Sequence, residues 1–225
     1  MRTLTEEHLA TLRRHMVEVV DIQYDLASDE TGRVRPGIRL RAAMMDLPRH
    51  LFVPAPIGAM AYQDRPLPIG FDKTISQPFM AALMIDLLDL KPSDRVLEVG
   101  TGLGYQTALL AGLCAAVWSV DVVEEFVVAA AERLAALDRA NVTLRVGDGS
   151  RGWPDEGPFD AILVSAAAKE LPHALASQLQ VGGRMVLPIG GKGVQSLTRV
   201  ERISDDEVAA AEVMSVQFTE LETDP

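Results

Sequence analysis

The sequence predicts an α/β fold in which a mostly parallel sheet carries helices on both faces. From residue 78 onward, apolar segments of strand length alternate with segments of helical periodicity. One strand, residues 96–99, is joined by a glycine-rich turn to a helix at residues 105–113, as in nucleotide-binding βα units. Another strand, residues 159–164, is continuously apolar, as expected when both faces of a parallel sheet are covered. Crossovers between such strands are right-handed.

Length, composition and charge narrow the functional class. The chain has 225 residues, enough for one domain with a substantial core, and its composition of 48% hydrophobic and 24% charged residues is ordinary for a soluble protein. A net charge of −11 argues against nucleic acid as a partner, because phosphate binding needs concentrated Lys and Arg. No apolar run could span a bilayer and no secretory signal is visible, so we expect a cytoplasmic protein without a membrane partner. The four histidines lack metal-ligand spacing, so we expect no metal site.

The N-terminal third predicts two helices and a long irregular segment. Apolar residues at helical spacing mark residues 4–20, and residues 38–47 form a second helix that Pro48 ends. Between them, residues 21–37 are polar and rich in glycine and proline, which predicts a loop. Residues 49–70 have little periodicity, and so long an irregular stretch inside a compact domain is usually functional.

A further helix is predicted to begin at Pro78 and to continue through Leu87. Proline suits the first turn of a helix, where its missing N–H costs nothing. Ser76 would then be the N-cap residue. This structural role is an alternative to any functional role for Ser76.

The remaining elements complete the predicted sheet. Strands are expected at residues 96–99, 116–120, 141–146, 159–164 and 185–187, with weaker candidates at 197–200 and 213–218. Helices are expected at residues 105–113, 124–137 and 172–179, and Gly182 and Gly183 should break the last of them. The acidic tail, residues 219–225, is expected to fray.

The glycine-rich turn is the strongest candidate for a binding site. Gly100, Gly102 and Gly104 follow Glu98 and precede the helix that starts at Tyr105. Gly-x-Gly-x-Gly after an acidic residue is the form seen in methyltransferases that use S-adenosylmethionine (AdoMet), although glycines also serve plain tight turns. The pattern therefore favours AdoMet over a dinucleotide.

Two further strand ends support this interpretation. Asp121 ends the second strand, where its carboxylate could accept from ribose hydroxyls or cap the next helix. Asp148, between Gly147 and Gly149, could accept from an exocyclic amine, or the segment could be only a turn. Because ligands of α/β sheets gather at the carboxyl ends of strands, the agreement of these positions favours an AdoMet site.

At this point the sequence resembles the protein-L-isoaspartate O-methyltransferase family over roughly residues 48–202. The most specific match is Thr74-Ile75-Ser76-Gln77-Pro78 at its distance ahead of the glycine turn. Other matching segments include residues 48–54, 61–62, 67–70, 96–102, 104–106, 147–149, 158–162, 178–179 and 182–184.

The resemblance implies a Rossmann-like class I methyltransferase sheet with its last strands exchanged and an N-terminal helical extension over the active site. It implies AdoMet-dependent methylation of the α-carboxylate of L-isoaspartyl residues in damaged proteins or peptides, which starts repair through a succinimide. The active-site serine falls on Ser76. The implied cofactor contacts are Glu98, Gly100, Thr101, Gly102, Gly104, Tyr105, Asp121, Val122, Gly147, Asp148 and Gly149. The implied substrate contacts are Thr74, Ile75, Ser76, Gln77 and Phe79.

Such a reaction needs orientation more than a base, because the accepting carboxylate is already ionised at neutral pH, with a reference pKa near 4. We therefore expect Ser76 to orient the substrate. The chain is expected to form one domain, divided into an N-terminal extension and lid (1–75), a core (76–202) and a C-terminal strand with tail (203–225).

Departures from the family fall on substrate-facing segments. Asp72 and Lys73 replace a Gly-Gln-like pair, and the last strand ends in Phe218-Thr219-Glu220-Leu221 where the family usually has Phe-Val-Pro-Leu. Two alternatives therefore stay open, a specialised carboxyl methyltransferase acting on a dedicated peptide and a non-catalytic AdoMet-binding module. The sequence leaves the oligomeric state and the natural substrate unknown.

Overall fold

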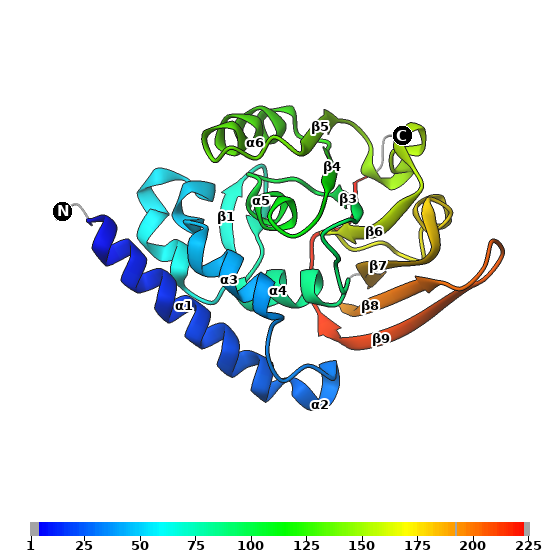
Figure 1. The fold of residues 1–225 in the computed structure, drawn as a ribbon, viewed down its shortest axis with the longest axis horizontal. Coiled ribbons are helices and arrows are strands. Elements are labelled where there is room, and N and C mark those ends of the chain that lie inside the picture. The colour runs from blue at the N-terminus through cyan, green and yellow to red at the C-terminus, as the bar shows by residue number, and fades with distance from the viewer. Residues whose placement is uncertain (1–4, 192, 223–225) are drawn as a thin grey trace.

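In the part of the chain that the computed structural model describes, residues 5–191 and 193–222, seven strands form the central sheet (Figure 1). Their order is β5-β4-β3-β6-β7-β8-β9, so the last three strands follow one another in chain order. The parallel strands are β3 (Arg95–Val99), β4 (Ala116–Asp121), β5 (Val142–Val146), β6 (Phe159–Val164) and β7 (Leu179–Gly191). The antiparallel strands β8 (Val194–Arg202) and β9 (Val208–Val216) complete the sheet. The predicted α/β class is confirmed.

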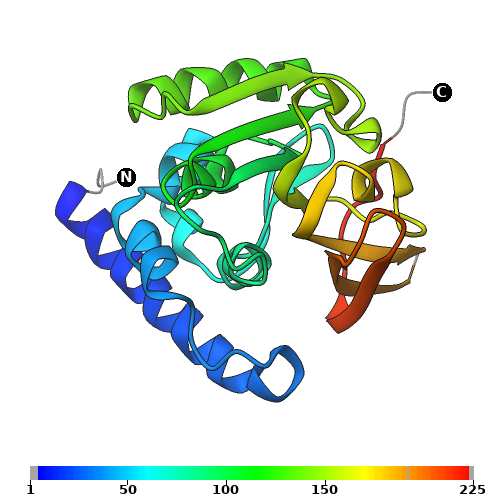
Figure 2. The same ribbon diagram turned by 45° about the vertical axis from the view of Figure 1, so that its right-hand side comes forward.

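Side chains of the central strands alternate between two apolar clusters, one on each face of the sheet. Val96 packs with the cluster that contains α4 (Pro78–Asp86), α5 (Tyr105–Ala111) and α6 (Glu124–Ala136). Leu97 packs on the other face, where the cover is the short helix α7 (His173–Ala176). In Figure 2 the N-terminal helices lie at the lower left, α6 lies along the top, and the last strands lie at the right.

The N-terminal segment is more helical than the sequence predicts. Helix α1 spans Glu6–Leu26, α2 spans Ser28–Thr31 and α3 spans Ile38–Asp46, so the predicted loop at residues 21–37 is wrong at residues 21–26 and 28–31. The reason is tertiary packing, because Tyr24 is fully buried and meets the ring of Phe79 edge-on at 5.5 Å. Leu4, where the first helix was expected to begin, lies outside the described residues.

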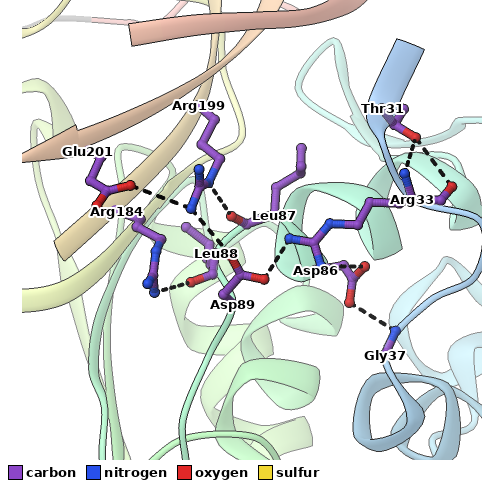
Figure 3. A network of polar contacts seen from close by, with 10 residues as sticks. All are labelled: Thr31, Arg33, Gly37, Asp86, Leu87, Leu88, Asp89, Arg184, Arg199 and Glu201. Carbon is purple, nitrogen blue, oxygen red and sulfur yellow. Dashed lines mark hydrogen bonds and ion pairs between the residues drawn. The ribbon is translucent and has the colours of Figure 1, made fainter. Parts of the chain in front are cut away.

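A polar network ties this N-terminal segment to the sheet (Figure 3). Arg33 contacts both Asp86, the last residue of α4, and Asp89, three residues beyond it. Asp89 also contacts Arg199 of β8 at 3.3 Å, and the carboxylate of Asp86 accepts from the backbone N–H of Gly37 at 2.9 Å. The end of α4 therefore joins the N-terminal segment to the antiparallel strands.

Replacing Asp86 with alanine is expected to lower the free energy of unfolding by about 2 kcal/mol. The change leaves the Gly37 N–H without its acceptor and removes one of the two carboxylates beside Arg33, and the Asp86 side chain is only 9% exposed. Urea unfolding of the variant measures the loss. Asp206→Ala, at an exposed turn, is the matched control, and equal unfolding curves for the two variants would contradict the prediction.

The segment predicted to be irregular is built from tight turns and one hairpin. It contains the 3₁₀ helices η1 (Arg49–Phe52) and η2 (Ala55–Tyr62), followed by β1 (Leu67–Gly70) and β2 (Lys73–Ile75). These two strands pair antiparallel and lead directly into α4 at Pro78. The predicted start of α4 is confirmed, and so is the helix predicted at residues 38–47.

The C-terminal half differs from the prediction at three places. Strand β7 runs through Gly182 and Gly183, because Arg184 and the residues after it pair with β6, so the predicted glycine break is wrong. Helix α7 has only four residues, and β8 and β9 are longer than predicted. Residues 219–221 are held by hydrogen bonds to Ala167, so the tail is not frayed there. Residues 223–225 lie outside the described part of the chain.

Candidate active site

A cleft opens at the carboxyl ends of β3 and β4. Ligands of open α/β sheets bind at this edge. It brings together ten of the residues that the sequence singles out: Thr74, Ile75, Ser76, Gly100, Thr101, Gly102, Tyr105, Asp121, Val122 and Gly149. Glu98, Gly104, Gly147, Asp148, Gln77 and Phe79 are not among the lining residues.

The glycine-rich turn forms the floor of the cleft. Strand β3 ends at Val99, and α5 begins at Tyr105. Gly104 has a φ of 93°, and a Cβ there would lie 3.2 Å from the Cβ of Ala130 on α6. A side chain at this position would be strained by its backbone and crowded by α6, so the turn can pass under the cleft only with glycine.

Asp121 links the glycine-rich turn to the next strand. One carboxylate oxygen accepts from the Gly102 N–H at 2.8 Å, and the other accepts from the Val123 N–H at 3.0 Å. The N-cap residue of α6 is Val123, so the alternative in which Asp121 caps that helix is wrong. Burial raises the pKa of Asp121, while the two N–H donors oppose the rise. Asp121 also lines the cleft, and each of its carboxylate oxygens can accept a further hydrogen bond.

The segment after β5 contributes Gly149, and not the Asp148 carboxylate, to the lining of the cleft. Gly149 lines the cleft, whereas Asp148 accepts from the Ser150 N–H at 2.8 Å and caps the turn η3 (Gly149–Arg151). Residues 147–149 therefore do form the turn that the sequence offered as an alternative to a binding role for Asp148. A Cβ on Gly149 would lie 2.4 Å from Val99, so this position needs glycine for packing.

Glu98 lies beneath the glycine-rich turn and is fully buried. One carboxyl oxygen accepts from Thr107 at 2.5 Å and from Ser119 at 2.6 Å, and Ser119 in turn contacts Thr101 at 2.6 Å. The other oxygen has no hydrogen-bond partner among the described residues. Burial raises the pKa of Glu98 to about 7, against the stabilising effect of the two hydroxyl donors.

This raised pKa predicts a pH-dependent contribution to stability. Between pH 4.5 and about 7 the unfolded chain loses the Glu98 proton while the folded chain keeps it, so the free energy of unfolding falls as pH rises. A shift of this size corresponds to a loss of order 3 kcal/mol. Unfolding curves between pH 4.5 and 8 should show wild type losing stability relative to Glu98→Gln. Parallel pH profiles for the two proteins would refute the prediction.

The wall opposite the glycine-rich turn carries Ser76. The N-cap residue of α4 is Gln77, so the predicted capping role of Ser76 is wrong. Asp64 serves the start of the helix instead, because its carboxylate accepts from the Phe79 N–H at 2.9 Å and from the Gln77 amide at 2.7 Å. The Ser76 side chain is thereby left for the cleft.

A buried arginine supports this wall. Arg49 is fully buried, and its guanidinium donates to the carbonyl oxygen of Ala61 at 2.8 Å and to that of Ser76 at 2.6 Å. The same group lies 4.6 Å from the centre of the Tyr105 ring, at the start of α5. Arg49 thus connects the segment that bears Ser76 with the glycine-rich turn.

Several lining residues were not predicted as site residues. They are Ile69, Lys73, Val99, Leu103, Gln106, Val120, Phe126, Ser165, Ala166 and residues 219–222. The Ser165 hydroxyl donates to the Gln106 side chain at 3.4 Å. Both residues lie close to the carboxyl end of a strand, and this position in the sequence could have identified them as site residues. Residues 219–221 stood out only as a departure from the family's usual Phe-Val-Pro-Leu ending, and Glu222 carried no signal, because the polar pattern of this segment is that of a surface tail.

The residues of the cleft fit AdoMet. Apolar side chains of Val99, Val120 and Phe126 offer a dry surface for a base, and the Asp121 carboxylate offers an acceptor for hydroxyl groups. The described residues hold no group of three or more His, Cys, Asp or Glu side chains that could bind a metal ion. None of the helices in residues 5–191 and 193–222 combines the length and apolar character that a membrane span needs.

Comparison with known proteins places these features in a family. The family model of protein-L-isoaspartate(D-aspartate) O-methyltransferase matches residues 30–224. Protein-L-isoaspartate O-methyltransferase 1 of Polaromonas sp. is 44% identical over 220 residues, which cover 98% of this chain and 93% of that protein. The enzyme of Syntrophus aciditrophicus is 51% identical over 168 residues, covering 75% of this chain and 77% of the relative.

Solved structures agree with the fold. A structure of a protein-L-isoaspartate O-methyltransferase superposes with a TM-score of 0.79 at 25% identity, covering 92% of this chain and 65% of that one. This chain therefore spans about two thirds of that longer protein. A β-aspartate methyltransferase from Plasmodium falciparum, in complex with S-adenosyl-L-homocysteine, gives a TM-score of 0.78 at 24% identity, covering 96% and 98% of the two chains.

Proposed function

Since the chain belongs to the protein-L-isoaspartate(D-aspartate) O-methyltransferase family, we propose that it methylates the α-carboxylate of L-isoaspartyl residues, with AdoMet as co-substrate. The observation that carries the proposal is the cleft itself. It sets Ser76, of the segment most specific to the family, together with the glycine-rich turn and Asp121. The product is a methyl ester, which closes to a succinimide with loss of methanol. Water then reopens the succinimide in part as normal aspartate, so the reaction starts repair of damaged proteins or peptides.

The proposed roles divide between the two sides of the cleft. The glycine-rich turn, with Thr101 and Tyr105, would cradle the amino-acid part of AdoMet. Asp121 and Val122 would hold the ribose, and the turn at Gly149 would border the adenine. Glu98, Gly104 and Asp148 do not line the cleft and would support this surface through the hydrogen bonds and packing described above. Gly147 would support it as well, because its N–H donates to the Asp121 carbonyl at 2.9 Å.

The chemistry requires the chain to orient one carboxylate. AdoMet supplies an electrophilic methyl group on a sulfonium centre. The substrate carboxylate is ionised near neutral pH, so no residue has to remove a proton from it. Thr74, Ile75 and Ser76 would hold its oxygen in line with the methyl group, with the Ser76 hydroxyl donating to the carboxylate. Orientation of this kind contributes roughly 7 kcal/mol or more to lowering a barrier, and exclusion of water adds to it.

Gln77 and Phe79 would act on substrate indirectly. The Gln77 amide is bound to Asp64, and Phe79 packs on Tyr24, so both fix the start of α4 just behind Ser76. We also propose residues 1–75 as the extension and lid, 76–202 as the core and 203–225 as the C-terminal part of one domain. We propose a cytoplasmic location. We also propose a protein or peptide substrate in preference to nucleic acid, which the net charge of −11 disfavours.

Ser76→Ala is expected to lower kcat/KM for an isoaspartyl peptide roughly tenfold to a hundredfold, as the loss of one charge-assisted hydrogen bond. The AdoMet dissociation constant should stay within about twofold of wild type, because Ser76 belongs to the opposite wall. Steady-state kinetics and calorimetry measure the two quantities. Ser177→Ala, at the exposed end of α7, is the control, and full turnover by Ser76→Ala would exclude an orienting role.

A panel of isoaspartyl peptides, each with a matched aspartyl peptide, tests the function. We expect methyl transfer to the isoaspartyl members only, with little dependence on flanking sequence. Activity confined to one peptide context would favour a dedicated peptide substrate, which the charges of Asp72 and Lys73 beside the cleft make a specific alternative. AdoMet binding without methylation of any carboxylate would indicate a non-catalytic binding module.

A further inference from the structure

The segment after β9 crosses the cleft as a strap, defined here as residues 218–222. In Figure 2 it is the red trace that rises from the end of the last strand toward the green strands. The backbone of its first residue makes two hydrogen bonds with one side chain, because the Phe218 N–H donates to Gln195 at 2.6 Å and the Gln195 amide donates to the Phe218 carbonyl at 3.1 Å. Gln195 is itself 94% buried, since only 6% of it is exposed.

The middle of the strap pairs with the loop that follows β6. The Ala167 N–H donates to the Thr219 carbonyl and the Leu221 N–H donates to the Ala167 carbonyl, each at 2.8 Å. Thr219, Glu220, Leu221 and Glu222 all line the cleft. The core of the protein therefore fixes the strap from one side as far as Leu221.

The far end of the strap reaches the opposite wall. Glu222 forms an ion pair with Lys73 of β2, three residues before Ser76, and both residues line the cleft. The charges of this pair act on the nearby Asp121, whose pKa Lys73 lowers and Glu222 raises. The pair thus joins the strap to β2 at the part of the cleft that contains Asp121, the proposed acceptor for the ribose hydroxyls.

We propose that Lys73 and Glu222 are positioning residues that retain the AdoMet-derived ligand, by holding the strap across the cleft. This inference rests on the proposed function. The pair touches neither the methyl group nor the accepting carboxylate in this role. Its effect is on how fast the bound nucleotide leaves.

The strength of the pair fixes the size of the effect. The side chains of Lys73 and Glu222 are 23% and 56% exposed, and pairs so open to water make modest contributions that salt screens. We therefore expect Glu222→Gln to raise the dissociation rate of S-adenosylhomocysteine roughly two- to fivefold at low salt. High salt should raise the wild-type rate toward that of the variant and leave the variant nearly unchanged.

Stopped-flow displacement of S-adenosylhomocysteine at low and high salt is the decisive measurement. The charge-exchanged double variant Lys73→Glu/Glu222→Lys should restore a slow, salt-sensitive rate. Asp21→Asn, which breaks the comparably exposed pair with Arg41 far from the strap, is the matched control and should match wild type. Equal dissociation rates and equal salt dependence for wild type and Glu222→Gln would overturn the proposal.

Amide hydrogen exchange of the ligand-free protein separates this inference from the proposed function. The Leu221 N–H should exchange faster in Glu222→Gln than in wild type, because the strap loses its outer attachment. Unchanged exchange would overturn the retaining role even if methyl transfer is observed. Absence of binding heat with AdoMet and S-adenosylhomocysteine would instead defeat the proposed function, while faster Leu221 exchange would still establish the attachment.

Discussion

Arg49→Met is expected to lower the free energy of unfolding by about 2–6 kcal/mol, the largest stability effect that we predict, because two buried carbonyl groups lose their donor. The guanidinium is fully buried and satisfies the carbonyl oxygens of Ala61 and Ser76. Methionine fills much of the space but donates no hydrogen bond, so both carbonyls stay buried without their donor. Burial lowers the pKa of Arg49, and the nearby Tyr105 opposes this effect.

Urea unfolding measures this loss, and kinetics should show an additional one. Because Arg49 holds the Ser76 carbonyl, kcat/KM for an isoaspartyl peptide should fall even at temperatures where the variant is folded. Arg49→Lys should be intermediate, since one ammonium cannot reproduce the planar fork of donors. Arg35→Ala, at an exposed position, is the control. A stability of Arg49→Met within about 1 kcal/mol of wild type would contradict the account of the wall.

Asp121→Ala is expected to weaken binding of AdoMet and S-adenosylhomocysteine roughly a hundredfold or more. The carboxylate is the proposed acceptor for ribose hydroxyls, and hydrogen bonds to a charged group contribute about 1.5–3 kcal/mol each. The same carboxylate receives the Gly102 N–H, so its removal also frees the glycine-rich turn that lies under the ligand. Both effects act on the cofactor, and neither acts on the peptide.

Isothermal titration calorimetry with each ligand tests this expectation. Glu125→Gln, on the exposed first turn of α6, is the matched control and should bind like wild type. Asp121→Asn should fall between alanine and wild type, because its one carbonyl oxygen can accept while its amide cannot. Wild-type affinity in Asp121→Ala would remove the carboxylate from the binding site.

The central strands and the glycine-rich turn could be predicted because their causes are local. Buried parallel strands leave continuous apolar runs, and tight turns under a ligand leave glycines at fixed spacing. Glu98 shows the limit of such reasoning. Its position after an apolar strand was readable, but its hydroxyl partners Thr107 and Ser119 come from a helix and a neighbouring strand. Only the fold could show that its carboxyl lies behind the cleft surface.

The misplaced features depend on residues distant in sequence. Ser76 looked like a helix cap, yet the helix start is served by Asp64, which lies in the preceding irregular segment. Residues 21–26 looked like a loop, yet Tyr24 becomes helical where it packs on Phe79. The strap looked like a surface tail, yet Ala167 and Lys73 bind it. The sequence pattern within one segment cannot predict contacts with residues that only the tertiary fold brings close to it.

Lys73 and Glu222, which form an ion pair beside the cleft, are 149 positions apart in the chain. The cleft therefore depends on segments that only the folded chain brings together. Thermodynamic linkage then makes nucleotide occupancy a global stabiliser. At a free ligand concentration a hundred times the dissociation constant, occupancy would add about 2.7 kcal/mol to the native state. Cellular persistence of this protein would thereby follow the supply of its own methyl donor.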